Sequence, residues 1–295
     1  MEKPRVRQVS AFVPSFLVCK IAESLSVTPG FEQTKVTSRH EAVRGRLRGK
    51  TVIIYRSGSV VYDETLKEVK SILEEILYEH YKREGTVVGS DEAGKGEALG
   101  PLVVAATALT PRQAAHLKSI GIADSKLIPE TRIRILAREI KRASLGYSVL
   151  IIAPFRLNQM FMRKREYGNL NDILARAHRQ VLERVVSKIA EKPSQIVVDK
   201  FDSSRSGERI RLIQDAFPGL KVQAVEKGEV FPAVAAASIL ARNSYLKWIR
   251  KNVDKEILRR VRNGDFSFLS EKNAKPFYYF KTCYLTRLLN PRGGK

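Results

Sequence analysis

The chain has 295 residues, of which 43% are hydrophobic and 28% charged, a composition typical of a folded globular protein. It holds 53 Lys and Arg against 31 Asp and Glu, and the resulting net charge of +22 favours a polyanionic partner such as nucleic acid. No apolar run reaches the roughly 18 residues of a membrane span, no secretion signal is recognisable, and the two cysteines form neither a disulfide framework nor a zinc motif, so we expect a cytoplasmic protein.

Residues 1–82 have the pattern of a small α+β domain. The segment 51–62 predicts two short strands around a Ser-Gly turn, and the apolar residues of 66–81 recur at the three- and four-residue spacing of an amphipathic helix. Basic residues alternate just before this segment, and alternation along one strand would place them on one face, either as a phosphate-binding row or as a solvated surface. These residues are Arg44, Arg46, Arg48 and Lys50.

Residues 86–295 alternate strands with helices, which indicates an α/β sheet covered by helices. Strands are expected at 86–91, 101–109, 146–153, 195–198 and 220–225. Helices are expected at 129–143, 155–163, 170–191, 205–216 and 232–253. The charged stretch between the two regions is interpreted as a linker, which divides the chain into two domains.

Acidic residues stand at the ends of two of these strands. Asp91 and Glu92 end the first strand in a glycine-rich segment, and Asp199 ends the apolar strand 195–198. Glu229 precedes the alanine-rich helix. Because ligand sites of α/β sheets collect at strand ends, we expect Asp91 and Asp199 to converge there.

A cluster of carboxylates in a basic protein indicates divalent-metal chemistry on a phosphate. Hard ions such as Mg²⁺ prefer oxygen ligands, and two such ions about 4 Å apart stabilise the attacking and leaving oxygens of an in-line phosphoryl displacement. The same residues also fit a structure without metal, in which Asp91 and Asp199 cap turns and Glu229 is a solvated charge.

The segment 89–106, GSDEAGKGEALGPLVVAA, resembles the opening motif of the type 2 ribonucleases H. Further motifs of that family follow in the same order: DSKL at 124–127, NLNDILARAH at 169–178, VVDKF at 197–201 and AVAAASILAR at 233–242. The Asn-x-Asn followed by Ala and His, and the late segment NAKPFYYFKT at 273–282, are similar to the ribonuclease HIII branch. The strand-turn-strand with YRSG resembles the substrate-binding extension of that branch, whose fold resembles half of the TATA-box-binding protein.

The resemblance implies an RNase H-like catalytic domain over 86–295, with a mixed sheet flanked by helices and a C-terminal helical extension, preceded by a substrate-binding α+β domain at 1–82. It implies an endoribonuclease that hydrolyses the RNA strand of RNA/DNA hybrids with two Mg²⁺ or Mn²⁺ ions and leaves 5′-phosphate and 3′-hydroxyl ends. We expect a monomer that needs no protein partner. Cleavage at single ribonucleotides in duplex DNA, as by ribonuclease HII, and a non-catalytic nucleic-acid-binding protein remain alternatives.

Four active-site acids follow from the family pattern: Asp91, Glu92, Asp199 and Glu229. The last has a competitor in Glu226, because this chain has one residue fewer between the acid and the Ala-Ser-Ile helix than the family pattern. The sequence Lys-Gly-Glu at 227–229 resembles the Lys-Ala-acid of the family and favours Glu229.

Five residues are candidates for contacts with the substrate backbone. Glycines let a main chain approach a sugar closely, so the loop Gly94-Lys95-Gly96 suits recognition of the ribose 2′-hydroxyl, although a tight turn alone would also explain the glycines. Lys95 stands where relatives have Arg or Thr. Ser125 and Lys126 suit phosphate contacts, as a small donor and a point charge.

Three further polar residues precede or lie in the helix expected at 170–191. Asn169 and Asn171 either contact the substrate backbone or fix a loop. His178 lies in an apolar helical stretch and is interpreted as a core histidine rather than a catalyst.

Overall fold

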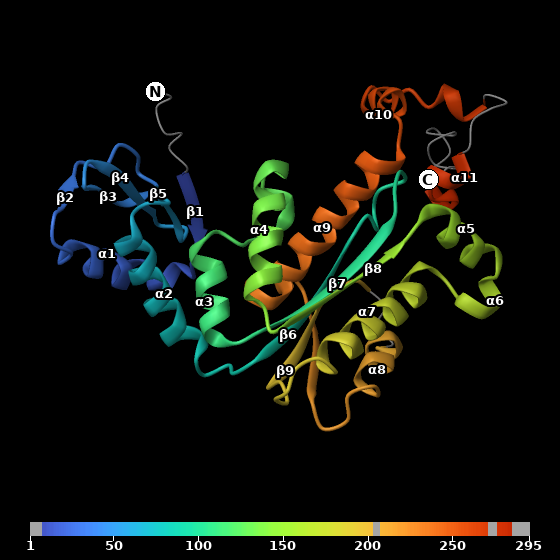
Figure 1. The fold of residues 1–295 in the computed structure, drawn as a ribbon, viewed down its shortest axis with the longest axis horizontal. Coiled ribbons are helices and arrows are strands. Elements are labelled where there is room, and N and C mark those ends of the chain that lie inside the picture. The colour runs from blue at the N-terminus through green and yellow to red at the C-terminus, as the bar shows by residue number, and fades with distance from the viewer. Residues whose placement is uncertain (1–7, 203–206, 271–275, 285–295) are drawn as a thin grey trace.

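The computed structural model describes residues 8–202, 207–270 and 276–284 (Figure 1). Its N-terminal part is a five-stranded antiparallel sheet in the order β1-β5-β4-β3-β2 with two helices. The elements are β1 (Gln8–Phe12), α1 (Val18–Ser26), β2 (Phe31–Thr34), β3 (Glu41–Leu47), β4 (Lys50–Tyr55), β5 (Ser59–Asp63) and α2 (Lys67–Tyr81). The predicted strand pair and helix are confirmed, whereas β1, β2 and α1 were not predicted.

The predicted row of four basic side chains on one strand is wrong. β3 ends at Leu47, and Arg48 with Gly49 forms a turn in which both residues have positive φ, so that Lys50 already belongs to β4. The outer members of the set are also paired within the chain. Arg44 contacts Glu41 at 2.7 Å, and Lys50 Nζ lies 2.9 Å from Asp63 Oδ1.

The larger part of the chain contains a second five-stranded sheet in the order β10-β9-β6-β7-β8. Its strands are β6 (Val87–Ala93), β7 (Leu102–Leu109), β8 (Gly146–Ile152), β9 (Gln195–Asp199) and β10 (Lys221–Val225). β10, β9 and β6 are parallel to one another, and β7 and β8 are antiparallel to their neighbours. The mixed sheet that the family resemblance implies is therefore confirmed.

Helices cover both faces of this sheet, as Figure 1 shows. One face carries α3 (Pro111–Ser119), α4 (Glu130–Ala143) and α9 (Pro232–Asn252); the other carries α7 (Leu170–Val186) and α8 (Glu208–Gln214). Alternation along β7 explains the two layers, since Val103 packs on the α9 side and Val104 on the α7 side. α7 ends five residues earlier than the expected residue 191.

Other short helical elements occur between and after these. They are α5 (Pro154–Met162), α6 (Lys164–Tyr167), α10 (Lys255–Arg262), α11 (Pro276–Tyr279) and the 3₁₀ turns η1 (Ser15–Leu17), η2 (Ser125–Leu127), η3 (Gly228–Val230) and η4 (Ser267–Ser270). Among the helices of the described residues, none is both long and apolar enough to cross a membrane.

α9 packs unusually close to the centre of the sheet. A Cβ atom at Gly89 on β6 would lie 2.4 Å from the backbone nitrogen of Val234, so only glycine fits this crossing. Thr107 on β7 donates its hydroxyl to the carbonyl of Ala233 at 2.7 Å. These contacts place the first turns of α9 beside the end of β6.

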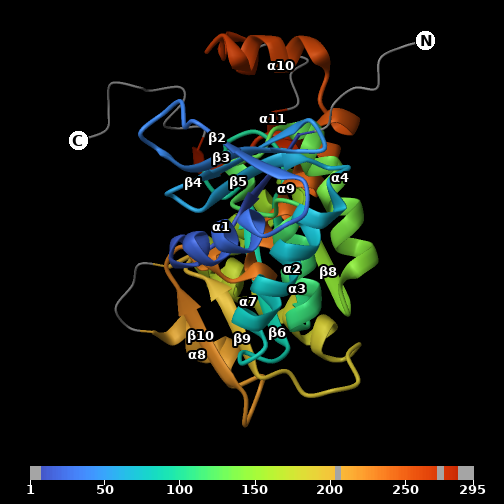
Figure 2. The same ribbon diagram turned by 90° about the vertical axis from the view of Figure 1, so that its left-hand side faces the viewer.

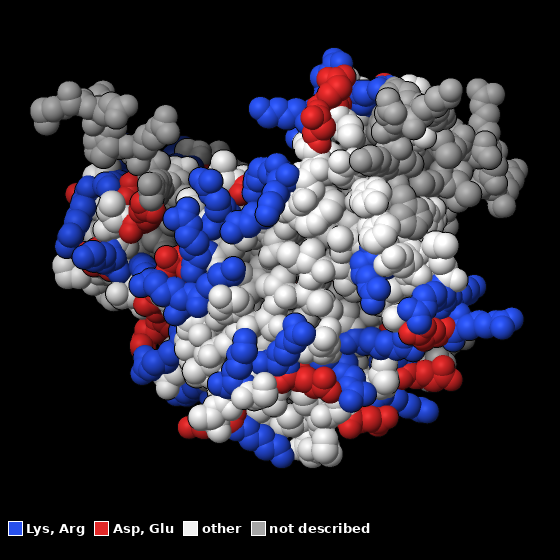
Figure 3. All heavy atoms as spheres, turned by 45° about the vertical axis from the view of Figure 1, so that its right-hand side comes forward, with Lys and Arg blue, Asp and Glu red and all other residues white. Residues whose placement is uncertain are grey.

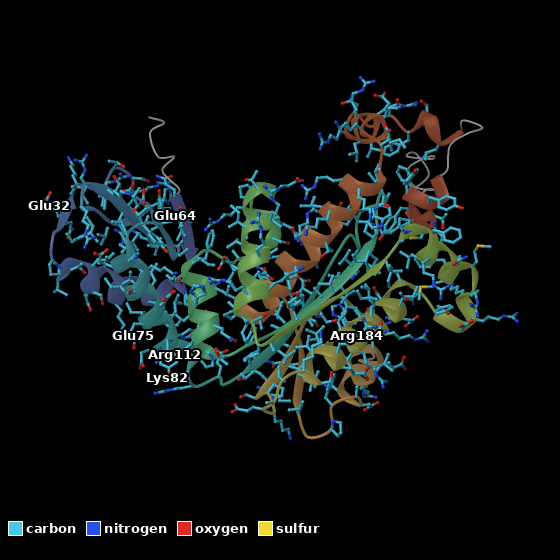
Figure 4. The ribbon with its side chains drawn as sticks, viewed as in Figure 1. Glu32, Glu64, Glu75, Lys82, Arg112 and Arg184 are labelled. Atoms are coloured by element: carbon cyan, nitrogen blue, oxygen red, sulfur yellow. The ribbon has the colours of Figure 1, made fainter. Side chains whose placement is uncertain are left out.

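The two sheets share one hydrophobic core, which runs from Val9 to Leu246. α2 packs against α3 (Figure 2). The hydroxyl of Tyr62 on β5 donates to the carbonyl of Ser119 at the end of α3 at 2.9 Å. At the lower end of this helix pair, the guanidinium of Arg112, labelled in Figure 4, lies 4.1 Å from the ring centre of Tyr78. The division into domains at residues 82–86 stays a prediction.

Candidate active site

Three acidic side chains meet at the end of two adjacent strands. Asp91 and Glu92 are on β6, Asp199 ends β9, and these two strands are parallel neighbours. One carboxylate oxygen from each residue lies within 4.8 Å of the other two. The predicted convergence of Asp91 and Asp199 is confirmed, because the parallel register pairs Ser90 with Val198 and the two acids follow at the same level.

The cluster is electrostatically costly without a cation. Burial, followed by repulsion from Glu92 and Asp199, raises the pKa of Asp91 well above its ordinary value. Burial also raises the pKa of Asp199, although the backbone N–H of Gly228 donates to its Oδ1 at 2.8 Å and opposes the shift. Glu92 Oε2 is buried and accepts no hydrogen bond within the described residues. Three such oxygens form the donor set that a hard divalent ion prefers.

A pair of serine hydroxyls connects Asp91 to the segment predicted to bind phosphate. Ser238 on α9 faces Asp91 and opposes the rise of its pKa, and the Ser238 hydroxyl lies 2.9 Å from that of Ser125 at the start of η2. Ser238 was not among the residues predicted for the site. The missed signal is a single hydroxyl within a run of buried alanines, where an unsatisfied polar group would be costly.

The structure separates the two candidates for the fourth acid. Glu229 on η3 lines the same cleft as the three clustered acids, and its charge raises the pKa of Asp199. The side chain of Glu226 is 76% exposed, pairs with Lys200 at 2.7 Å and lines a different pocket. Glu229 is thus the acid that faces the cleft, although it lies outside the 4.8 Å cluster.

The cleft has a volume of about 750 Å³ and combines acidic, basic and glycine residues. Every candidate for backbone contact except the two asparagines lines it: Gly94, Lys95, Gly96, Ser125 and Lys126. Lys95 Nζ lies 3.9 Å from Glu92 Oε1 and donates to the carbonyl of Phe201. On the face in Figure 3, Lys and Arg side chains gather on both sides of the hollow between the N-terminal sheet and α10.

The glycine loop 94–100 is held by a segment from much later in the chain, Tyr279–Tyr284. The N–H of Gly100 donates to Tyr279, the N–H of Lys281 donates to Ala98, and Lys281 Nζ donates to the carbonyl of Glu97 at 2.5 Å. The Tyr284 hydroxyl donates to the carbonyl of Lys95. Lys281 is fully buried, and burial lowers the pKa of its ammonium group to about 8. Of the late motif at 273–282, residues 273–275 lie outside the described residues.

The two predicted asparagines do not line the cleft. Asn169 caps α7, since its Oδ1 accepts the backbone N–H of Asn171 at 2.9 Å. Asn171 Nδ2 donates to Asp202 at 3.1 Å. This geometry matches the loop-fixing interpretation, and substrate contact by either residue stays a prediction. His178 is fully buried on α7, as a core histidine should be, but it lies directly behind Glu92.

Comparison with known proteins adds an independent observation. Residues 88–263 match the family model described as Ribonuclease HII. A protein of Bacillus anthracis named Ribonuclease HIII is 33% identical over 164 residues, 55% of this chain and 51% of that protein. One of the same name from Bacillus thuringiensis subsp. konkukian is 30% identical over 217 residues, 67% of this chain and 68% of that protein. The match thus spans about half the length of the first relative.

The crystal structure of Bst-RNase HIII in complex with Mn²⁺ has the same fold, with a TM-score of 0.59 over 97% of this chain and 99% of that chain. Sequence identity in this superposition is 18%. The superposition includes the N-terminal part as well as the large sheet.

Proposed function

Because the chain belongs to the type 2 ribonuclease H family and is most like ribonuclease HIII, we propose that it hydrolyses the RNA strand of RNA/DNA hybrids with divalent cations. The observation that carries this proposal is the cluster of Asp91, Glu92 and Asp199 in a cleft on a protein of net charge +22. The positive surface attracts a polyanion, while the acidic cluster needs a cation before a phosphate can approach it.

The residues of the cleft fit Mg²⁺ or Mn²⁺. The pKa of Asp91 is raised, and the buried Glu92 Oε2 accepts no hydrogen bond from any residue that the structure describes, so the negative charge of the cluster is not fully compensated among these residues. We assign Asp91, Glu92, Asp199 and Glu229 as the residues that would hold the cations, with Asp91 at the centre of the set. When bound, such cations activate an attacking water and stabilise the departing 3′ oxygen, which leaves 5′-phosphate and 3′-hydroxyl ends.

The cleft also suits recognition of a ribonucleotide. Gly96 is the more informative glycine, because a Cβ atom there would meet nothing within 4 Å, so the fold itself does not require glycine at this position. Gly94 differs: it has a φ of +86°, and a Cβ atom would lie 2.2 Å from the carbonyl oxygen of Pro101. We assign the exposed backbone at Gly96 to the 2′-hydroxyl, and Lys95, Ser125 and Lys126 to phosphates.

We propose that residues 1–82 bind the hybrid next to the cleft and that the protein acts as a monomer in the cytoplasm. The basic side chains on both sides of the hollow in Figure 3 support a nucleic-acid path between the N-terminal sheet and α10.

The test is cleavage of an end-labelled RNA/DNA hybrid in Mg²⁺ and in Mn²⁺, beside a DNA duplex with one ribonucleotide. We expect wild type and the control Glu226→Gln to cut the hybrid at similar rates. Asp91→Asn removes several kcal/mol of transition-state stabilisation, and its rate should fall at least about 100-fold.

Two results would contradict the proposal. Cleavage restricted to the single-ribonucleotide duplex would indicate ribonuclease HII-like activity instead. Hybrid binding without cleavage by the wild-type protein in either metal would indicate a nucleic-acid-binding protein without catalysis.

A further inference from the structure

His178 is held rigidly behind the acid cluster. It is fully buried on α7, and its Nδ1 lies 3.0 Å from the hydroxyl oxygen of Ser90 on β6. Its ring stacks on that of Phe201, two residues beyond Asp199, with 4.8 Å between the ring centres and 13° between the planes. The imidazole is therefore fixed against both strands that carry the acids.

The other ring nitrogen faces Glu92. His178 Nε2 lies 3.4 Å from Glu92 Oε2, and both atoms are buried without a hydrogen bond to any other described residue. Each buried polar atom without a partner costs about 1–3 kcal/mol. An N–H···O bond has a usual length of about 2.7–3.2 Å, so a shift of a few tenths of an ångström would satisfy both atoms at once.

The strand geometry explains why His178 contacts Glu92 and not the neighbouring Asp91. Ser90 and Glu92 are two residues apart on β6 and both point to α7, whereas Asp91 points to the opposite face, toward Ser238 on α9. The two oxygens of Glu92 also differ: Oε2 faces His178, and Oε1 faces Lys95 in the cleft at 3.9 Å.

We propose that His178 is a positioning residue, whose Nε2–H holds Glu92 Oε2 and so directs Oε1 toward the cation. This inference rests on the proposed function in so far as Glu92 is a metal ligand. His178 is not a catalytic base, because Glu92 stands between its ring and the cleft, and the ring does not line the cleft. Partners that fix a ligand in this way typically contribute 10- to 100-fold to metal affinity.

Two substitutions separate the roles of the ring nitrogens. The amide nitrogen of Asn occupies the place of Nδ1, two bonds beyond Cβ, and that of Gln occupies the place of Nε2, three bonds beyond it. His178→Asn therefore keeps the Ser90 contact and loses the Glu92 contact, whereas His178→Gln keeps the Glu92 contact. We expect titration calorimetry with Mn²⁺ on the substrate-free protein to show about 10-fold weaker binding for His178→Asn and less than 3-fold for His178→Gln. Equal losses in both variants, or none, would overturn the proposal.

The wild-type protein offers a second test that no folding defect can spoil. The chain has four histidines, so ¹⁵N NMR of the imidazole rings can be assigned to single residues. With diamagnetic Mg²⁺ present, we expect the ring proton of His178 to lie on Nε2. We expect Nδ1 to carry no proton and to accept a hydrogen bond from the hydroxyl of Ser90. A proton on Nδ1 alone would refute the assignment.

These measurements do not depend on cleavage. If wild type binds Mn²⁺ but fails to cut any hybrid, the proposed function fails while the calorimetry still decides the role of His178. If the hybrid is cut and both variants bind Mn²⁺ like wild type, the positioning role fails alone.

Discussion

Asp91→Asn should stabilise the protein in the absence of metal, although it abolishes the proposed activity. Asp91 is the acid whose pKa is most strongly raised, by burial and by the charges of Glu92 and Asp199. Asn keeps an oxygen for the backbone N–H of Glu92, which donates to Asp91 Oδ1 at 2.6 Å. The substitution thus removes a repulsive charge and preserves the local hydrogen bond.

The magnitude follows from the geometry. Two unit charges separated by the 4.8 Å limit of the cluster repel each other by about 3.5 kcal/mol at an effective dielectric constant of 20. Asp91 experiences two such interactions, but it takes up a proton rather than bear the full repulsion. We therefore expect a gain of about 2 kcal/mol in the free energy of unfolding, or about 3 °C in Tm for a chain of 295 residues.

The effect has a defined pH dependence. An acid whose pKa is raised by folding contributes stability when protonated, and the wild type loses that contribution as pH rises through the raised pKa. The stability difference between Asp91→Asn and wild type should be small below the ordinary carboxyl pKa of about 4 and should grow as pH increases above it.

Denaturant unfolding in EDTA and in Mn²⁺ measures the difference. A cation at 100 times its dissociation constant stabilises wild type by about 2.7 kcal/mol, which exceeds the expected 2 kcal/mol gain of the variant, so Mn²⁺ should reverse their order. If Asp91→Asn is less stable than wild type in EDTA at pH 8, or if Mn²⁺ leaves the difference unchanged, the cluster does not store the repulsion inferred here.

Four other substitutions test the cleft. Gly96→Ala should leave Tm unchanged and weaken hybrid binding about 10-fold. Gly94→Ala should lower Tm, because Gly94, unlike Gly96, has a positive φ and a backbone atom that a Cβ would clash with. Equal behaviour of the two variants would argue against a substrate role for Gly96. Lys281→Met keeps the packing and removes the ammonium that donates to the carbonyl of Glu97. KM for the hybrid should therefore rise several-fold while Mn²⁺ affinity stays unchanged, and a change in Mn²⁺ affinity would contradict this. Glu229→Gln should weaken Mn²⁺ binding at least about 10-fold by calorimetry, whereas Glu226→Gln should have no effect. The reverse result would make Glu226 the fourth acid.

The sequence was sufficient for features that depend on local pattern. Apolar runs and spacing located β6, β7, β9 and α9, and the rule that ligand sites lie at strand ends brought Asp91 and Asp199 together. Residue types and family motifs also selected Glu229, which the structure places in the cleft.

Contacts between distant segments were beyond such reasoning. The hydroxyl of Ser238, the imidazole of His178 and the ammonium of Lys281 each contact a residue of the segment 91–97 from more than 80 positions away. The spacing of residues along a helix does not predict which distant residue a buried polar side chain will bond to. The row of basic residues failed for a different reason, because the turn at Arg48 interrupts the strand that the alternation assumed.

The late contact between Lys281 and Glu97 has a consequence for biosynthesis. Glu97 precedes Lys281 by 184 residues, which a ribosome adds in about 10–40 s. Asp91 and Glu92 are made before Glu97, and Asp199 and Glu229 follow Glu97 by 102 and 132 residues, so all four carboxylates are in the chain before the segment that holds the loop. The order of translation thus delays the completed cleft until the protein that surrounds it has been made.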